Sequence, residues 1–147
     1  LKEHSHWVNF LSLNTDYILK SSCYEPINIS KIITGSHSMQ ELVQFANDRY
    51  DQFLKSNSEM MASCSDDFTM ILWKMKDGKY HSTRLCGHQA PINHVVFSPD
   101  GRILASASFD KSIKLWNGST GKYRISFYLD LSLHCVVILI RFIRSVS

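Results

Sequence analysis

The sequence has 147 residues, 44% of them hydrophobic and 20% charged, which is typical of about one soluble globular domain. The formal net charge of +3 is too small to indicate nucleic-acid binding by itself. The four cysteines show no CxxC pair and no even spacing, which argues against a disulfide framework and favours reduced, buried thiols in a cytosolic or nuclear protein. They are Cys23, Cys64, Cys86 and Cys135.

Two stretches of the sequence are near copies of each other. They read MASCSDDFTMILW (Met61–Trp73) and LASASFDKSIKLW (Leu104–Trp116). Each places small residues before an acid and ends in alternating apolar residues closed by Trp. The acids Asp67 and Asp110, like the two Trp residues, are about 43 positions apart. A fixed period of this length indicates a repeat architecture.

A degraded copy of the repeat is predicted at the start of the chain. The segment His4–Asp16 aligns with His88–Asp100 at an offset of about twice the period. A further step back from the acids reaches Glu25 in LKSSCYE, and the serine four positions earlier is Ser21. We therefore expect residues 1–37 to form a degenerate first unit.

The segment Ser38–Leu54 changes from a period of two to a period of 3.6. Its helical face consists of Met39, Leu42, Val43, Ala46, Tyr50, Phe53 and Leu54. Ser38 followed by Glu41 is a capping-box start. The residues Tyr50–Leu54 also align with a strand of the last copy, so we expect a helix only from about Met39 to Asp48. This helix and the second unit would occupy residues 38–86, and the helix is either a packing decoration or a partner-binding insertion.

Residues 87–126 contain the signals of four short strands. The run Ile92–Phe97 is followed by SPDG, which suits a type I turn. The strands Ile103–Ser108 and SIKLW come next, and NG with Gly121 predicts a hairpin into a strand near Lys122–Ser126. Four antiparallel strands in about 40–45 residues form one blade of a β-propeller.

The repeat resembles the WD-repeat family. The residues that carry the resemblance are HSHWVN (His4–Asn9), the helical segment followed by SDDFTMILW (Ser65–Trp73), and the long stretch GHQAPINHVVFSPDGRILASASFDKSIKLWNGSTGKY (Gly87–Tyr123). The departures from the family pattern are Glu3 in place of Gly, and Lys74 and Asn117 in place of Asp. The resemblance implies an all-β fold: a partial WD40 propeller of about three four-stranded antiparallel blades with one short helical insertion.

The same resemblance implies a buried relay of hydrogen bonds in each blade, from a Trp indole through Ser and His to Asp. The last unit supplies all four members, which are His88, Ser106, Asp110 and Trp116. The second supplies Ser63, Asp67 and Trp73, but its His position falls on Phe45. The first supplies His4 and Ser21, with Glu25 for Asp and no Trp. Ser108 is an alternative to Ser106 as the relay serine, and the turn spacing favours Ser106.

Residues 127–147 should begin another copy but carry none of its signals. The apolar run Val136–Ile143 is shorter than the ~18–20 residues of a membrane-spanning helix. We expect a divergent tail, foreign to the repeat rather than an improvised strand. A propeller needs at least four blades to close, and this chain has room for little more than three repeats. We therefore expect the isolated chain to be marginally stable and prone to self-association. The absence of a starting Met suggests part of a longer protein.

Within the WD-repeat family, the likeness is to members that act in ribosome assembly. It implies a non-enzymatic scaffold of the nucleus and nucleolus, without a cofactor, a membrane or sequence-specific nucleic acid as partner. Such proteins bind the precursor of the large ribosomal subunit (pre-60S) through the propeller, and a midasin-type AAA ATPase grips their ubiquitin-like domain, which this sequence does not show. Members are also linked to Notch signalling. The alternative is a generic WD40 adaptor in a signalling or ubiquitin-ligase complex.

The residues before the relay acids are predicted to lie on the top rim of the propeller, between the second and third strands of each blade. They are Tyr24, Asp66 and Phe109. An exposed aromatic residue there would anchor a protein partner. The alternative is that these residues pack between neighbouring blades.

Two kinds of enzyme are disfavoured. A Ser-His-Asp hydrolase needs an exposed Ser beside an oxyanion hole, whereas Ser106 is predicted to lie in mid-strand with Trp as its donor. His4 and His6 are two positions apart on a predicted strand, but no third ligand at a suitable spacing completes a metal site. We therefore expect neither catalytic residues nor a metal.

Overall fold

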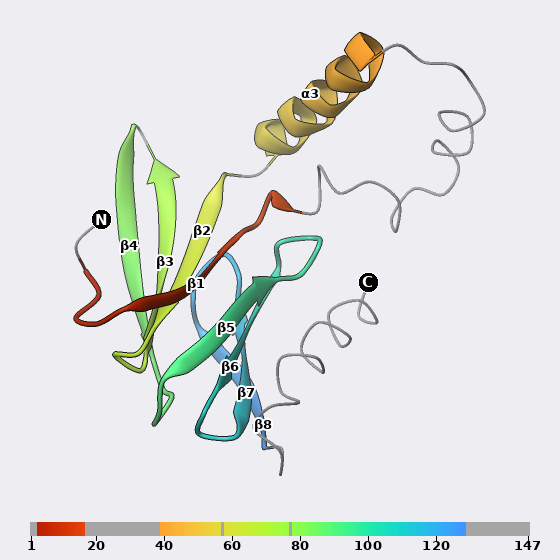
Figure 1. Cartoon of the computed structure of the whole chain (residues 1–147). Helices are drawn as coiled ribbons and strands as arrows, with labels where there is room; N and C mark the ends of the chain where they lie inside the picture. The colour runs from red at the N-terminus through yellow and green to blue at the C-terminus, as the bar shows by residue number, and fades with distance from the viewer. Residues whose placement is uncertain (1–2, 17–38, 57, 77, 129–147) are drawn as a thin grey trace.

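The computed structural model describes residues 3–16, 39–56, 58–76 and 78–128. They form two four-stranded antiparallel sheets and one helix (Figure 1), which confirms the expected all-β architecture. The first sheet consists of β1 (Val8–Leu13), β2 (Met60–Ser65), β3 (Thr69–Lys76) and β4 (Lys79–Cys86). The second consists of β5 (Ile92–Phe97), β6 (Ile103–Ser108), β7 (Ser112–Asn117) and β8 (Tyr123–Tyr128).

Both sheets have the same topology and nearly the same register. Each strand pairs with its neighbours in chain order, so each sheet is a four-stranded meander. Met61 pairs with Trp73 in the first sheet, and Leu104 pairs with Trp116 in the second. The first strands of the two sheets, β1 and β5, lie side by side (Figure 1). This arrangement is that of two adjacent propeller blades.

The strand β1 belongs to the same sheet as β2, although a long segment separates them in the chain. Leu11 pairs with Ser63, and Leu13 pairs with Met61. Residues 8–13 therefore do not belong to a separate first unit, and the prediction of such a unit over residues 1–37 is wrong for this strand. The described residues contain two sheets, where about three were expected. The repeat count assumed that the loops between strands have a constant length. Strand pairing depends instead on position in space, so β1 pairs with β2 across a long insertion.

Asn14 fixes the point where the chain leaves and re-enters the first sheet. Its backbone N–H donates to the Met60 carbonyl at 3.1 Å, and its side-chain oxygen accepts from the Met60 N–H at 2.9 Å. The amide group of Asn14 also donates to the Ser58 carbonyl at 3.0 Å. Since Asn14 is only 1% exposed, these bonds close the end of the sheet at the base of the insertion.

The insertion ends in the helix α3 (Met39–Ser56), which extends away from the sheets (Figure 1). Its start agrees with the prediction, but its predicted end near Asp48 is wrong, and Tyr50–Leu54 is helical instead of forming a strand. In the sheet, β1 occupies the position expected for that strand. The apolar residues of Tyr50–Leu54 instead continue the helical period of 3.6 in α3. No helix in the described part of the chain is long and apolar enough to cross a membrane.

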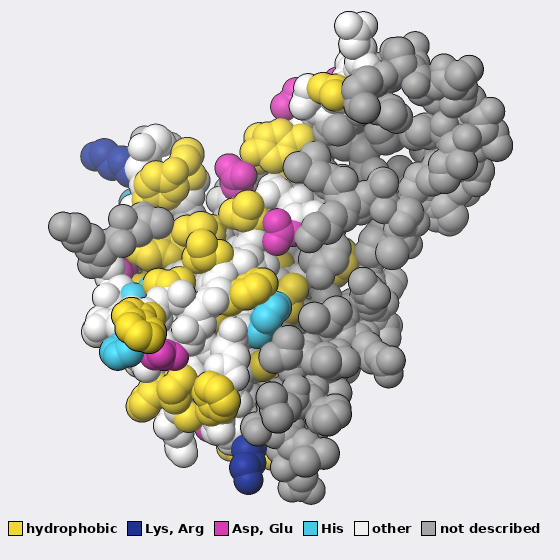
Figure 2. All heavy atoms as spheres, in the orientation of Figure 1, with side chains coloured by type: hydrophobic (Ala, Val, Ile, Leu, Met, Phe, Trp, Pro, Cys, Tyr) yellow, Lys and Arg dark blue, Asp and Glu magenta, His cyan; other side chains and the backbone are white. Residues whose placement is uncertain are grey.

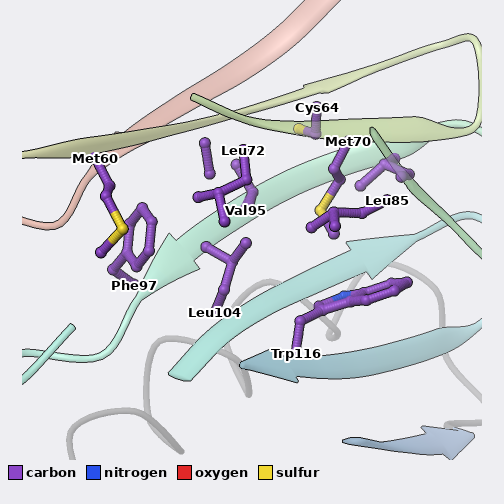
Figure 3. Close-up of a cluster of buried hydrophobic side chains, with 11 residues drawn as sticks. Met60, Cys64, Met70, Leu72, Leu85, Val95, Phe97, Leu104 and Trp116 are labelled. Carbon is purple, nitrogen blue, oxygen red and sulfur yellow. The ribbon is translucent and has the colours of Figure 1, made fainter. Parts of the chain in front are cut away.

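The core lies between the two sheets (Figure 3). The first sheet contributes mainly Met60, Cys64, Met70, Leu72 and Leu85, and the second contributes mainly Val95, Phe97, Leu104 and Trp116. All of these side chains are at most 7% exposed. Each large member stabilises the fold by roughly 1.5–3 kcal/mol through burial, so the facing sheets hold each other in place.

The other face of the first sheet is exposed at β1. Leu11 and Leu13 take the same places in β1 that Val95 and Phe97 take in β5. The exposed fractions are 54% and 37% for the two leucines but 0% for Val95 and Phe97. The difference arises because the first sheet covers the second, whereas within the described residues no sheet covers the first.

Candidate functional site

The second sheet contains a chain of four hydrogen-bonded side chains. The indole N–H of Trp116 donates to the Ser106 hydroxyl at 3.0 Å. That hydroxyl lies 2.8 Å from His88 Nε2, and His88 Nδ1 lies 2.7 Å from a carboxylate oxygen of Asp110. Ser106, Trp116 and His88 are 0%, 3% and 7% exposed. The structure thus brings together the four residues that the sequence assigned to this relay.

The protonation states that satisfy every group follow from burial and charge. Burial lowers the pKa of His88 and outweighs the opposing effect of Asp110. Burial would raise the pKa of Asp110, but hydrogen bonds from Ser112, His88 and the Gln89 backbone lower it to about 2. At neutral pH a neutral His88 donates from Nδ1 to the ionised Asp110 and accepts at Nε2 from Ser106.

Asp110 also closes the turn between β6 and β7. One of its oxygens accepts the Ser112 N–H at 2.9 Å and the Ser112 hydroxyl at 2.6 Å. The other accepts the Gln89 N–H at 3.0 Å. The bonds support a left-handed backbone at Lys111, with φ of 62°. One carboxylate therefore connects the buried relay to the geometry of an exposed loop.

The first sheet contains an equivalent relay. Trp73 donates to the Ser63 hydroxyl at 2.9 Å, and His4 Nε2 lies 2.8 Å from the same hydroxyl. His4 Nδ1 lies 3.0 Å from Asp67. Burial would raise the pKa of Asp67, but hydrogen bonds led by that from Thr69 hold it well below its usual range.

His4 completes the blade that was predicted to lack a histidine, so that prediction is wrong. The position expected for the histidine, Phe45, lies in α3. His4 and Asp67 are 63 positions apart, whereas His88 and Asp110 are 22 apart, because the insertion separates the first two strands of this sheet. Ser21, the partner predicted for His4, and Glu25 lie outside the described residues.

Ser108, the alternative relay member, has a different role. Its hydroxyl donates to the carbonyls of Ala90 and Pro91 at 3.0 and 2.9 Å. It also accepts the Asp110 N–H at 3.2 Å. Ser108 thus joins the entry to β5 with the turn after β6, and Ser106 occupies the relay position.

The chemistry of these groups is structural. The Ser106 hydroxyl is buried between an indole and an imidazole, so a substrate carbonyl cannot reach it. Both ring nitrogens of His4 are engaged, and its side chain is 6% exposed, against 56% for His6. Across residues 3–16, 39–56, 58–76 and 78–128, no three His, Cys, Asp or Glu side chains are grouped to hold a metal.

Two of the four cysteines lie in the described residues, and neither is in a disulfide there. Cys64 is fully buried in the core, and burial raises the pKa of its thiol to about 12. Cys86 is exposed at the end of β4. Cys23 and Cys135 lie outside the described residues.

The predicted rim residue Asp66 is at the turn between β2 and β3. One of its carboxylate oxygens accepts from the side-chain amide of Asn9 at 2.6 Å. The same amide donates to the Ile92 carbonyl of the second sheet at 3.0 Å. His6 Nδ1 lies 3.6 Å from the other carboxylate oxygen. Asp66 therefore lies at the junction of the two blades, and 29% of its side chain is exposed.

Phe109 is at the equivalent turn of the second sheet and is 55% exposed. Its N–H donates to the Pro91 carbonyl at 3.0 Å. Trp7, which was not predicted as a rim residue, occupies the position equivalent to Pro91 and is 78% exposed. The alignment of His4–Asp16 with His88–Asp100 contained the signal that places Trp7 on the rim. Tyr24 lies outside the described residues.

The relays and sheets agree with a direct family match. Residues 79–117 match the WD40 family, described as "WD domain, G-beta repeat". This match covers β4 to β7, from one blade into the next. The fold, the register and the match together define these residues as part of a WD40 β-propeller.

Several curated relatives specify the likeness further. The chain is 44% identical over 132 residues to "Ribosome assembly protein 4" of Saccharomyces cerevisiae, covering 86% of this chain and 24% of that protein. It is 52% identical over 80 residues to the "Notchless protein homolog" of Arabidopsis thaliana, covering 54% and 17%. It is 41% identical over 100 residues to "Protein Notchless" of Drosophila melanogaster, covering 68% and 20%. The chain therefore spans about a quarter or less of these relatives, and its predicted likeness to ribosome-assembly WD-repeat proteins is confirmed.

Proposed function

We propose that this chain belongs to a non-enzymatic scaffold that acts in assembly of the large ribosomal subunit. The observation that carries the proposal is the 44% identity over 132 residues to a protein named for ribosome assembly. The site supports a scaffold because the buried relay serines are hydrogen-bonded within the fold. Their role would be to hold each blade rigid, so that the rim loops keep one geometry for binding.

The proposed contact surface is the rim at Asp66 and Phe109. Phe109 is supported by its exposure of 55% and by a backbone fixed to Pro91. A rigid, exposed aromatic loses little conformational entropy when a partner covers it. The contacts of Asp66 with Asn9 support a position between two blades, which a single partner could span.

The proposed partners and location extend the family resemblance, and the relative named for ribosome assembly supports them. We propose the pre-60S particle as the partner of the propeller, in the nucleus and nucleolus. In a longer protein with a ubiquitin-like domain, a midasin-type AAA ATPase would act on that domain. A role in Notch signalling is proposed only through the names of two relatives.

Affinity purification of the tagged chain from cells tests the proposal. We expect enrichment of large-subunit precursors over small-subunit precursors, and a clear loss of this enrichment in Phe109→Ala. Ser119→Ala, a change in an exposed turn, is the matched control and should retain it. Recovery of signalling or ubiquitin-ligase components without ribosomal precursors would instead support the generic adaptor.

A further inference from the structure

Trp7 is far more exposed than the other tryptophans of the sequence. Its exposed fraction is 78%, whereas the other two tryptophans, Trp73 and Trp116, are 5% and 3% exposed. Trp is among the residues most enriched at energetically dominant interface positions. Its indole offers a large apolar face together with an N–H donor. Figure 2 shows hydrophobic, His and acidic side chains lying next to one another on one face of the molecule.

The backbone around Trp7 is fixed before any partner binds. The Trp7 carbonyl accepts the Asp66 N–H at 3.1 Å. The His6 ring is 5.6 Å from the Trp7 ring between centroids, and His6 Nδ1 is 3.6 Å from Asp66. Asn9 donates to Asp66 and to the Ile92 carbonyl, which ties this frame to the second sheet. Such preorganisation lowers the entropic cost of binding.

Trp7 lies beside an acidic residue although the whole chain carries +3, because the Asp66 N–H donates to the Trp7 carbonyl at 3.1 Å. The relay acids Asp67 and Asp110 are paired with His4 and His88, and their side chains are only 8% and 12% exposed, against 29% for Asp66. Arg84 is already engaged, since it lies 3.6 Å from Asp67 and donates to the Glu3 carbonyl. Among the described residues, the only contact of the Asp66 oxygen that faces His6 is the one of 3.6 Å. Asp66 is therefore able to accept a charge-assisted hydrogen bond from a partner.

We propose that Trp7, His6 and Asp66 form a site for an arginine side chain of a protein partner. The guanidinium group stacks on the indole face and donates to the Asp66 carboxylate, which combines a cation–π contact with an ion pair. The inference rests on the scaffold function proposed above and names the chemistry of its partner. Nucleic acid fits poorly, because the Asp66 carboxylate would repel a phosphate group placed against Trp7.

The surface continues onto the second blade. Asn9 reaches the Ile92 carbonyl, and the adjacent Pro91 carbonyl accepts the Phe109 N–H. Phe109 thus offers a second exposed ring along the rim, suited to an apolar residue of the same partner segment. We therefore expect the bound segment to contain an arginine and an apolar residue close to it.

An array of short peptides tests the site with the intact chain. The peptides are made in pairs that differ only by Arg or Gln, each beside Leu or Phe, and an RNA oligonucleotide is included. We expect the chain to bind the Arg member at least about 10-fold more strongly. Trp7→Ala should lower binding by about 30-fold, as for a dominant interface residue. Asp66→Asn keeps the oxygen that accepts from Asn9 and should remove the preference for Arg over Gln.

Tyr80→Ala is the control, because Tyr80 is 63% exposed near the opposite end of the first sheet from the Asp66 turn. It should bind as the unchanged chain does, and far-UV circular dichroism should be the same for all variants. Equal binding of Arg and Gln peptides, undiminished binding by Trp7→Ala, an unchanged preference in Asp66→Asn, or stronger binding of RNA would each overturn the inference. Association with ribosomal precursors is measured separately, so its failure would count against the scaffold function and not against the arginine site.

Discussion

His4 and Ser63 are 59 positions apart in the chain, yet His4 Nε2 lies 2.8 Å from the Ser63 hydroxyl. The corresponding pair in the second sheet, His88 and Ser106, is only 18 positions apart at the same distance. Two relays of equal geometry are therefore built with connections of very different length. The long connection contains α3, so His4 links the segment before β1 to β2 across the insertion.

A double-mutant cycle at His4 and Ser63 should reveal this contact. We expect His4→Ala and Ser63→Ala each to lower the free energy of unfolding by about 1–3 kcal/mol, since each leaves a buried polar partner unsatisfied. Their coupling should be about 0.5–3 kcal/mol, measured by urea unfolding. His4→Ala combined with Ser106→Ala is the control and should be additive, because these residues belong to different relays. Additivity of the first pair would contradict the assignment of His4.

Ser106→Ala should be more disruptive than its size suggests. The hydroxyl is the only group between Trp116 Nε1 and His88 Nε2 in the relay, so its loss leaves a buried donor and a buried acceptor unpaired. We expect a loss of about 2 kcal/mol in the free energy of unfolding. Ser119→Ala, in an exposed turn, should change it by less than about 0.5 kcal/mol. Equal small effects in chemical denaturation would argue that the relay contributes little.

Acid should weaken the fold in two steps. The pKa of His88 is lowered from 6.5, so the unfolded chain takes up its proton first and stability falls as the pH drops below about 6.5. The pKa of Asp110 is lowered from 3.8 to about 2, so its contribution is present above pH 4 and is lost as the pH falls towards 2. Allowing for solvent screening, Asp110 contributes about 1–2 kcal/mol.

Urea unfolding at pH 7, 5 and 3 measures this dependence. Asp110→Asn should reduce the loss of stability between pH 5 and 3, whereas Asp51→Asn on α3 should leave it unchanged. Stability that rises on acidification would show that the relay does not hold an ionised Asp110 and a neutral His88.

Three glycines test backbone strain against crowding. Gly78 has φ of 70°, and no atom lies within 4 Å of the position that an added methyl would take, so Gly78→Ala should cost about 1–2 kcal/mol from conformation alone. Gly121 has φ of 71°, and its added methyl would also lie 2.5 Å from a Leu85 methyl. Gly118 would bring its methyl against the Gly101 carbonyl, which cannot move aside as a side chain does. We expect the losses measured by thermal unfolding to be larger for Gly118→Ala and Gly121→Ala than for Gly78→Ala.

The exposed face of the first sheet at β1 should promote self-association. Leu11 is 54% exposed and Val95, at the equivalent position, is 0% exposed. Leu11→Ser should therefore reduce association in sedimentation experiments with little loss of stability, because it removes exposed apolar area. Val95→Ser should lower the free energy of unfolding by about 2 kcal/mol or more, since it places a hydroxyl in the core. A monomeric wild-type chain at high concentration would contradict the first expectation.

Much of each blade could be predicted from local signals. The alternation in SIKLW, the SPDG turn, and the interval of about 43 positions between Trp73 and Trp116 are short-range properties, and the second sheet follows them closely. The relay itself was implied by the family resemblance, and its members His88, Ser106 and Asp110 could be placed because only short loops separate them. The end of α3 was not, since Tyr50–Leu54 has apolar residues compatible with either a strand or a helix.

By itself, the sequence determined the type of blade, the chemistry of its buried relay and the family that it resembles. Periodicity and turn residues act within a few positions, so they survive in any context. Only the tertiary structure decided which histidine serves the first blade, since a hydrogen bond depends on distance in space and the insertion removes any fixed spacing along the chain. It also decided which equivalent residues are covered: Val95 meets a neighbouring sheet, and Leu11 and Trp7 face outward because burial depends on what packs against a strand.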